Sequence, residues 1–338
     1  MKNKVGRILL FALAIAVFSF PAAEVTFAEG EEVYLGGMPI GIGLAENGLI
    51  VTGLVDVITD EGAICPARGS EILTNDVIVK VNGEEIASVS DFAAEVQKSG
   101  ESVTLTVKRG EREFSLSLIP VTDSLTGLKK LGLTLKSGVN GIGTLSFMLP
   151  DSLRFGALGH GIVDQDTGKL FVTDFGNIYS CKINGYRRGE KGKAGELSGR
   201  FTDREHPIGS VVKCNSFGVY GIAVPSLAEG LAKISLGGQK DVKTGAALMY
   251  TTISGDKPKA YKIDIVKASS QKRAQEKSML IRVTDPELLK ETGGILQGMS
   301  GSPIVQNGKL IGAVTHVLVN DSTLGYGLYI DWMMENAA

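Results

Sequence analysis

Short apolar segments joined by glycine-rich turns fill this chain, and they limit it to a mainly β fold. The chain has 44 glycines among its 338 residues, whereas aromatic residues make up only 6%. This combination suits many short strands joined by tight turns and disfavours a helical bundle. For the C-terminal part, the even spacing of short strands predicts one β-barrel or a pair of barrels.

Composition also narrows the classes of partner and cofactor. The formal net charge is −2, and no basic cluster stands out beyond Lys191–Lys193. There is therefore no electrostatic case for nucleic-acid binding. The three cysteines, Cys65, Cys181 and Cys214, contain no CxxC pair, so they indicate neither a metal motif nor a disulfide framework. We expect no metal and no other cofactor.

The N-terminal residues form a separate unit. Lys2, Lys4 and Arg7 precede the apolar run Ile8–Phe20, which is followed by small residues. This is the order of an export signal, and the apolar run is short for a full membrane span. Residues 1–30 are therefore predicted to be a signal peptide or an uncleaved membrane anchor. In either case, we expect the bulk of the chain to lie outside the cytoplasm.

Residues 33–121 have the pattern of one compact unit. Asn47-Gly48 is a strong hairpin signal between two apolar runs. Ser90–Lys98 reads as a short amphipathic helix closed by Gly100, and two alternating strands follow it. A polar stretch at 122–131 is predicted to be a linker to the C-terminal part.

The order of these elements resembles a PDZ domain, with a loop at Pro39–Ile42 and the run Asn75–Gly83. The resemblance implies that the amides of Ile40, Gly41 and Ile42 hold the terminal carboxylate of a peptide. The peptide would add as a strand between the sheet edge and the helix. Since the loop departs from the usual Gly-Leu-Gly-Phe-like pattern, the ligand could also be an internal segment or another part of this chain.

A serine in the segment Gly298–Pro303 is the candidate nucleophile. Ser300 lies close to glycines on both sides, which permits a bent backbone that exposes its hydroxyl. The amides of Gly298 and Ser300 could then point at one spot and form an oxyanion hole. The alternative is a glycine-rich surface loop beside a hairpin.

A catalytic serine needs a base, and the chain has only three histidines. His160 lies between two glycines, which leaves its ring uncrowded. His316 lies in an alternating run typical of a strand, and His206 precedes Pro207 in a charged stretch that reads as a turn. The pattern favours His160 and keeps His316 and His206 as alternatives.

The acidic partner of the histidine is the hardest member to place. Such an acid accepts a hydrogen bond from the ring nitrogen that faces away from the serine. Asp285 follows an apolar run and precedes Pro286, so it could stand beside the active centre or simply cap a helix over Pro286–Lys290. Asp174 and Asp164, which follow His160, are the other candidates.

The whole arrangement resembles the SpoIVB-type serine peptidases of spore-forming bacteria, on the segments Gly159–Gly161 and Gly293–Ile304. The resemblance implies a chymotrypsin-like peptidase domain over 132–338, with His160 as base, Asp285 as acid and Ser300 as nucleophile. It also implies a secreted signalling protease that acts between the two membranes around a forespore. Cleavage of a protein substrate, which could be the enzyme itself, would lead to intramembrane processing of a sigma factor.

Two other interpretations predict different behaviour. A PDZ-bearing scaffold without activity would bind extracytoplasmic partners, but such a scaffold has no need of the serine loop. A quality-control protease of the HtrA kind usually has its PDZ domain after the protease, whereas the PDZ-like unit comes first here.

Overall fold

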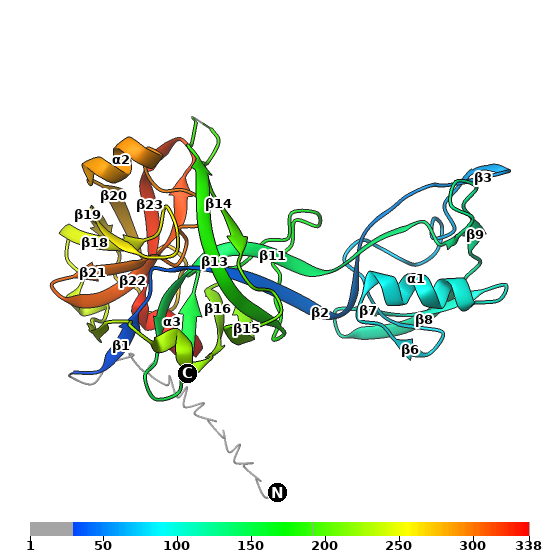
Figure 1. The fold of residues 1–338 in the computed structure, drawn as a ribbon, viewed down its shortest axis with the longest axis horizontal. Helices are drawn as coiled ribbons and strands as arrows, with labels where there is room; N and C mark the ends of the chain where they lie inside the picture. Colours follow the sequence, from blue (N-terminus) through cyan, green and yellow to red (C-terminus); the bar gives the residue numbers. More distant parts are fainter. Residues whose placement is uncertain (1–29, 191, 338) are drawn as a thin grey trace, which may run out of the picture.

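The computed structural model describes residues 30–190 and 192–337. Its fold is mainly β, as predicted, with a PDZ domain and a larger β part, called the peptidase part below. Figure 1 shows the two parts as separate bodies joined by the long strands β2 (Pro39–Leu54) and β11 (Leu133–Met148). The predicted export segment, except for Gly30, lies outside the described residues. Over the described ranges, no helix has both the length and the apolar character needed to cross a membrane.

The PDZ domain packs one helix against a small sheet. Helix α1 (Val89–Lys98) begins at Ser88, whose hydroxyl accepts the Asp91 amide while the Asp91 carboxylate accepts the Ser88 amide. This reciprocal pair satisfies two backbone donors at the start of the helix. Phe92 and Val96 lie on the buried face of α1, in the core of this domain. The strands of the domain are β3 (Val57–Thr59), β4 (Gly62–Ile64), β5 (Val77–Val81), β6 (Glu84–Glu85), β7 (Val103–Arg109), β8 (Arg112–Leu118), β9 (Val121–Thr122) and β10 (Lys129–Lys130).

The peptidase part has two hydrophobic cores. Ile40, Phe155 and Ile178 belong to the first, and Met249 and Ile304 belong to the second. Alternating inward side chains on short antiparallel strands fill both cores. Its remaining strands are β1 (Glu32–Leu35), β12 (Arg154–Ala157), β13 (Gly176–Arg187), β14 (Glu196–Phe201), β15 (Gly209–Asn215), β16 (Gly218–Ala223), β17 (Lys233–Leu236), β18 (Gly245–Thr251), β19 (Lys259–Ala268), β20 (Met279–Val283), β21 (Pro303–Gln306), β22 (Lys309–Leu318) and β23 (Asp321–Tyr329).

Two α-helices and two short 3₁₀ helices complete the peptidase part. Helix α2 (Pro286–Thr292) follows β20 and leads directly into the serine loop, while α3 (Ile330–Ala337) follows β23. The 3₁₀ helices are η1 (Pro225–Ala228) and η2 (Gln239–Asp241). The indole N–H of Trp332 on α3 donates to the Gln271 side-chain oxygen at 2.7 Å, which holds the segment before β20 against the C-terminal helix.

The PDZ domain is inserted into the peptidase sheet and does not simply precede it. Strand β1 pairs with β11 and β17, and the first half of β2 pairs with β11 and β13. The predicted PDZ range of 33–121 is therefore too long at its start. The predicted linker at 122–131 also belongs to the PDZ domain, because Leu131 is 2% exposed within its core and Lys130 forms an ion pair with Asp123.

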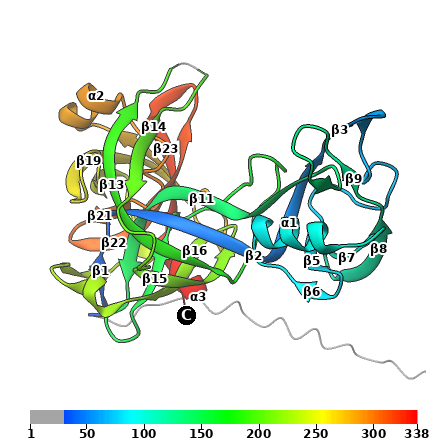
Figure 2. The same cartoon turned by 45° about the vertical axis from the view of Figure 1, so that its right-hand side comes forward.

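Strands β2 and β11 form one antiparallel ribbon between the two bodies. Their ladder runs from Leu54 opposite Leu133 to Pro39 opposite Thr144, and Figures 1 and 2 show it crossing from the PDZ domain into the barrel. The hairpin predicted at Asn47-Gly48 is wrong, because β2 continues through these residues. They form an irregularity in the ladder where β2 leaves one body and enters the other.

Candidate active site

The loop that carries Ser300 joins α2 to β21. Gly298 and Gly301 have φ values of 96° and 94°, a region that side chains other than glycine rarely adopt. A Cβ added to Gly301 would lie 2.1 Å from the Thr144 carbonyl oxygen, so the loop is also packed too tightly there for any larger residue. The side chain of Met299 is fully buried in the second core and holds the loop against it.

Two backbone amides of this loop are available to a ligand. The amides of Met299, Gly301 and Ser302 donate to carbonyl oxygens of Leu296, Val314 and Met299, respectively. Within the described residues, the amides of Gly298 and Ser300 form no hydrogen bond. Free amides two residues apart in a bent loop can hold the oxyanion of a tetrahedral intermediate.

The structure brings Ser300, His160 and His316 together around Thr315. The Ser300 hydroxyl donates to the Thr315 carbonyl oxygen at 2.7 Å. Gly159, next to His160, packs closely against Thr315. A Cβ atom added to Gly159 would lie 3.1 Å from the Thr315 methyl group. The rings of His160 and His316 lie with their centroids 4.7 Å apart. The segment before His160 packs in the first core and the Ser300 loop in the second, so the site lies between the two.

One hydrogen bond sets the tautomer of His160. Its Nδ1 lies 2.7 Å from the Gly161 carbonyl oxygen, which can only accept, so Nδ1 carries the proton. Nε2 is then the unprotonated nitrogen, which is the form that a general base requires. Burial lowers the pKa of His160 below its ordinary value of 6.5, so the neutral ring is favoured near neutral pH.

The neutral form of His316 is favoured as well. Burial, followed by the proximity of His160 and Lys277, lowers the pKa of His316 to about 4. Its Nδ1 is buried and has no hydrogen-bond partner within the described residues. A charge on one of the two neighbouring rings disfavours a charge on the other, so the pair provides at most one imidazolium at a time.

Asp285 does not join this group in the structure. Its Oδ1 accepts the amides of Glu287 and Leu288, and its Oδ2 accepts the amide of Lys262 at 3.2 Å. These bonds make Asp285 the N-cap of α2, which was the alternative interpretation. The predicted contact with His160 is therefore wrong for this arrangement, because the Gly161 carbonyl takes the place of the acid at Nδ1.

The other acids near His160 in sequence are also engaged elsewhere or exposed. Asp164 forms an ion pair with Lys136 of β11, and its Oδ1 accepts the amides of Asp166 and Thr167. Asp174 has an exposed side chain. Neither of them takes the acid position in this structure.

The third histidine is remote from this chemistry. The His206 ring is exposed and pairs with Asp203 at 2.9 Å, three residues earlier. The structure therefore shows the solvated turn that the charged stretch predicted for this histidine.

We expect Asp285→Ala to destabilise the protein by about 1 kcal/mol, because the first turn of α2 loses its cap. Asp285→Asn should lose less stability, since the asparagine oxygen can still cap the helix, although its NH2 group cannot accept the Lys262 amide. Thermal unfolding of the two variants checks this. Peptidase activity of the asparagine variant, measured in parallel, separates the cap from the acid role. An equal loss of stability in both variants would contradict the capping argument.

The predicted carboxylate loop at Ile40, Gly41 and Ile42 is also wrong. These residues lie in β2 inside the barrel, paired with β11 on one side and β13 on the other. Ile40 is fully buried and Ile42 is 1% exposed. Their amides and side chains belong to the first core of the peptidase and are not available to a peptide.

A different segment occupies the position next to the PDZ helix. Helix α1 lies against β10 and the start of β11, and the Gln97 side chain exchanges two hydrogen bonds with the Lys129 backbone. From Leu133 to Lys136, β11 pairs with β2 on one edge, and no described strand pairs with the other. The sequence contains a pattern that could have identified this segment. Leu131-Gly132-Leu133 matches the expected Gly-Leu-Gly-Phe-like pattern better than residues 40–42 do.

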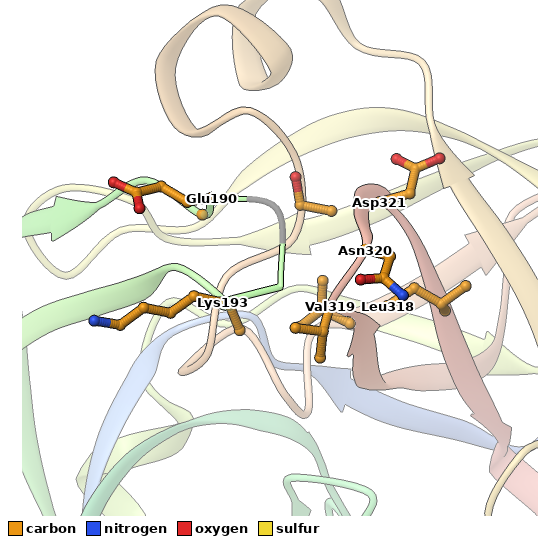
Figure 3. Close-up of a pocket in the computed structure, with 10 residues that line it drawn as sticks. Glu190, Lys193, Leu318, Val319, Asn320 and Asp321 are labelled. Atoms are coloured by element: carbon orange, nitrogen blue, oxygen red, sulfur yellow. The ribbon is translucent and has the colours of Figure 1, made fainter.

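A pocket with a volume of about 250 Å³ lies next to His316 in the chain. Figure 3 shows the β13–β14 turn, with Glu190 and Lys193, on one side and the β22–β23 turn, from Leu318 to Asp321, on the other. Val317 follows His316 directly and also lines the pocket. The pocket therefore adjoins the strand that holds Thr315 and His316.

The pH dependence of activity should follow the neutral form of His160. Because its pKa is lowered from 6.5, the acid limb of kcat/KM should have its midpoint below that value. Rates measured at constant ionic strength across that limb check this. His206→Ala, which changes an exposed ring, serves as control. A midpoint at or above 6.5 would contradict burial as the dominant influence.

The free energy of unfolding should also decrease as the pH falls below about 6.5. The unfolded chain protonates both half-buried histidines near pH 6.5, whereas the folded chain resists protonation until lower pH. The unfolded state therefore binds more protons below this value, and stability decreases as pH falls, by at most about 1.4 kcal/mol per pH unit for each histidine.

Two family models match parts of this chain. The family model described as SpoIVB peptidase S55 matches residues 127–334, and a PDZ domain model matches residues 39–119. Comparison with curated protein sequences gave no match.

Several solved structures are similar to parts of the chain. The PDZ domain of the SdrC-like protein from Listeria monocytogenes is 20% identical, with a TM-score of 0.22, over 27% of this chain and 90% of that one. The Rv3671c protease of M. tuberculosis, in an inactive form, is 16% identical, with a TM-score of 0.34, over 58% of this chain and 84% of that one. The HtrA-type protease AlgW with a decapeptide is 13% identical, with a TM-score of 0.34, over 74% of this chain and 66% of that one.

The S55 model extends over more than half of the chain and includes both the histidine and the serine of the site. The protein is therefore a serine peptidase of the SpoIVB peptidase S55 family and carries a PDZ domain.

Proposed function

We propose that this protein is an exported serine endopeptidase that acts as a signalling protease in spore formation, with Ser300 as nucleophile and His160 as general base. The observation that carries the proposed chemistry is the cluster around Thr315. It combines a serine hydroxyl, a neutral histidine with Nδ1–H bound to a carbonyl, and two unpaired loop amides.

The proposed reaction follows from these groups. Rotation of the Ser300 side chain away from the Thr315 carbonyl frees its hydroxyl to approach His160. Nε2 takes the proton as the oxygen attacks a peptide carbonyl, and the amides of Gly298 and Ser300 hold the resulting oxyanion. The imidazolium then protonates the leaving amine. Water, activated by the same ring, releases the acyl group and restores the hydroxyl.

The PDZ domain would supply a peptide-binding edge. The unpaired edge of β11 from Leu133 to Lys136, beside α1, can accept an extended peptide as an added strand. This location replaces the buried segment at 40–42. A bound segment could belong to a protein substrate, to another partner or to a further copy of this chain.

The setting in the cell is supported by the family and by the N-terminal sequence. The charged, apolar and small-residue order of residues 1–30 fits export. Together with the SpoIVB family membership, it supports the proposal that the enzyme acts in the space between the membranes around the forespore, with the segment either removed or kept as an anchor. Cleavage there would trigger intramembrane processing of a sigma factor.

The signalling role can be tested in a spore-forming host whose chromosomal gene is replaced by one that encodes the Ser300→Ala variant. Sigma-factor processing and spore counts should fall to the level of a deletion strain, while the variant protein remains at parental abundance. Normal processing in that strain, alongside Ser300-dependent cleavage by the purified wild-type protein, would contradict the signalling role and leave the peptidase assignment intact.

A further inference from the structure

Thr144 of β11 contacts both loops that form the site. Its hydroxyl donates to the Gly298 carbonyl oxygen at 3.0 Å, and its amide donates to the Ser300 carbonyl oxygen at 2.9 Å. Its own carbonyl accepts the amide of Leu158, two residues before His160, at 3.3 Å. Thr144 is 2% exposed, so water does not readily replace these bonds.

The hydroxyl bond fixes the peptide plane between Gly298 and Met299. At one end of this plane the Gly298 carbonyl accepts from Thr144. At the other end the Met299 amide donates to Leu296 at 3.1 Å. With both ends held, rotation about the bonds of Gly298 is restricted, although glycine alone would permit many conformations. The orientation of this plane determines how the Gly298 amide is directed relative to the Ser300 amide.

A second side chain of β11, that of Ser146, forms a hydrogen bond with the loop at Gly301. The hydroxyl of Ser146, which is fully buried, donates to the Gly301 carbonyl oxygen at 2.7 Å. The Ser300 carbonyl between these two contacts is held by the Thr144 amide. Three donors from β11, two on Thr144 and one on Ser146, therefore hold the carbonyl oxygens of Gly298, Ser300 and Gly301.

We propose that Thr144 is a positioning residue for the oxyanion hole: its side-chain hydroxyl holds the Gly298–Met299 peptide plane so that the Gly298 and Ser300 amides converge on the substrate carbonyl. The inference depends on the peptidase activity of the barrel and not on the proposed role in spore formation. Because the hydroxyl acts through the loop, its loss should weaken transition-state binding more than substrate binding.

Four full-length variants test the hydroxyl separately from the methyl group. Thr144→Val keeps the shape and removes the hydroxyl, Thr144→Ser keeps the hydroxyl, and Thr144→Ala removes both. Thr104→Val on β7 is the control, because this exposed threonine lies in the PDZ sheet and its side chain forms no hydrogen bond within the described residues. The substrate is a peptide spanning a bond that the wild-type protein cuts in a denatured protein.

We expect kcat of Thr144→Val to fall by about tenfold to a hundredfold with KM within about twofold, since a displaced oxyanion donor acts mainly on the transition state. The rate of labelling by a fluorophosphonate, whose phosphoryl oxygen occupies the same position, should fall by a similar factor. Thr144→Ser should retain most of both rates, and Thr104→Val should match the wild type.

A role in packing alone predicts the opposite order, with the valine variant more active than the serine variant. That order, or a folded valine variant with kcat within twofold of the wild type, would overturn the proposal. If the valine variant does not fold, the comparison of Thr144→Ser with Thr144→Ala decides, since both lose the methyl group and only one keeps the hydroxyl. Equal kcat values for these two would also overturn it.

Discussion

Ser300→Ala should abolish peptide hydrolysis and leave the fold unchanged. The substitution removes the only atom proposed to attack the substrate, and loss of a serine nucleophile lowers kcat by roughly 10⁶-fold in a comparable enzyme. The hydroxyl makes a single hydrogen bond, to the Thr315 carbonyl, so its removal affects little else. Mass spectrometry of products from wild-type and variant protein measures cleavage, self-processing and site preference together.

The same loop contains a matched control for this experiment. Ser302 is fully buried, and its hydroxyl has no hydrogen-bond partner within the described residues. Ser302→Ala removes the same atom type two residues away and should retain parental activity. Cleavage by Ser300→Ala at the wild-type rate would refute the nucleophile assignment, whereas equal loss in both variants would indicate damage to the loop.

His160→Ala should cause the second largest loss of activity, on the order of 10⁴-fold to 10⁶-fold. Among the described histidines, only His160 has its Nδ1–H bound to a carbonyl oxygen, and this substitution removes it. The kcat of the variant, measured at saturating peptide, checks the expectation. Its melting temperature should stay near that of the wild type, because the ring makes one hydrogen bond, to the adjacent residue.

His316 provides the critical comparison, because its ring lies against that of His160, with the centroids 4.7 Å apart. We expect His316→Ala to lower kcat by about tenfold at most, through loss of contact with the His160 ring. A complete loss in His316→Ala combined with a modest loss in His160→Ala would transfer the base role to His316. His206→Ala, which alters an exposed ring paired with Asp203, should have no effect on either measurement.

Local features of the site were predictable because contiguous residues carry them. The glycines around Ser300 permit the positive φ values that the bend requires, and this follows from residue type alone. The helix expected over 90–98 is found as α1 (Val89–Lys98), because its cap and apolar spacing are local signals. The mainly β character followed in the same way from strand length and turn residues.

Errors arose where a local signal competes with distant strands. Asn47-Gly48 has the composition of a hairpin turn, but β11 pairs with β2 on both sides of it, and the long ladder keeps the chain extended. Pro39–Ile42 has the composition of a loop, yet burial between β11 and β13 makes it a core strand. Asp285 matched both a cap and an acid, and only its three backbone donors distinguish them.

The amino-acid sequence by itself determined the mainly β class and the bent loop around Ser300, because these depend on dihedral preferences within a few residues. Tertiary structure alone decided that the PDZ domain interrupts the barrel, that Gly161 rather than Asp285 meets the His160 ring, and that Thr144 holds the loop. These features join residues far apart in the chain. Their pairing is set by burial and register, which no short sequence pattern specifies.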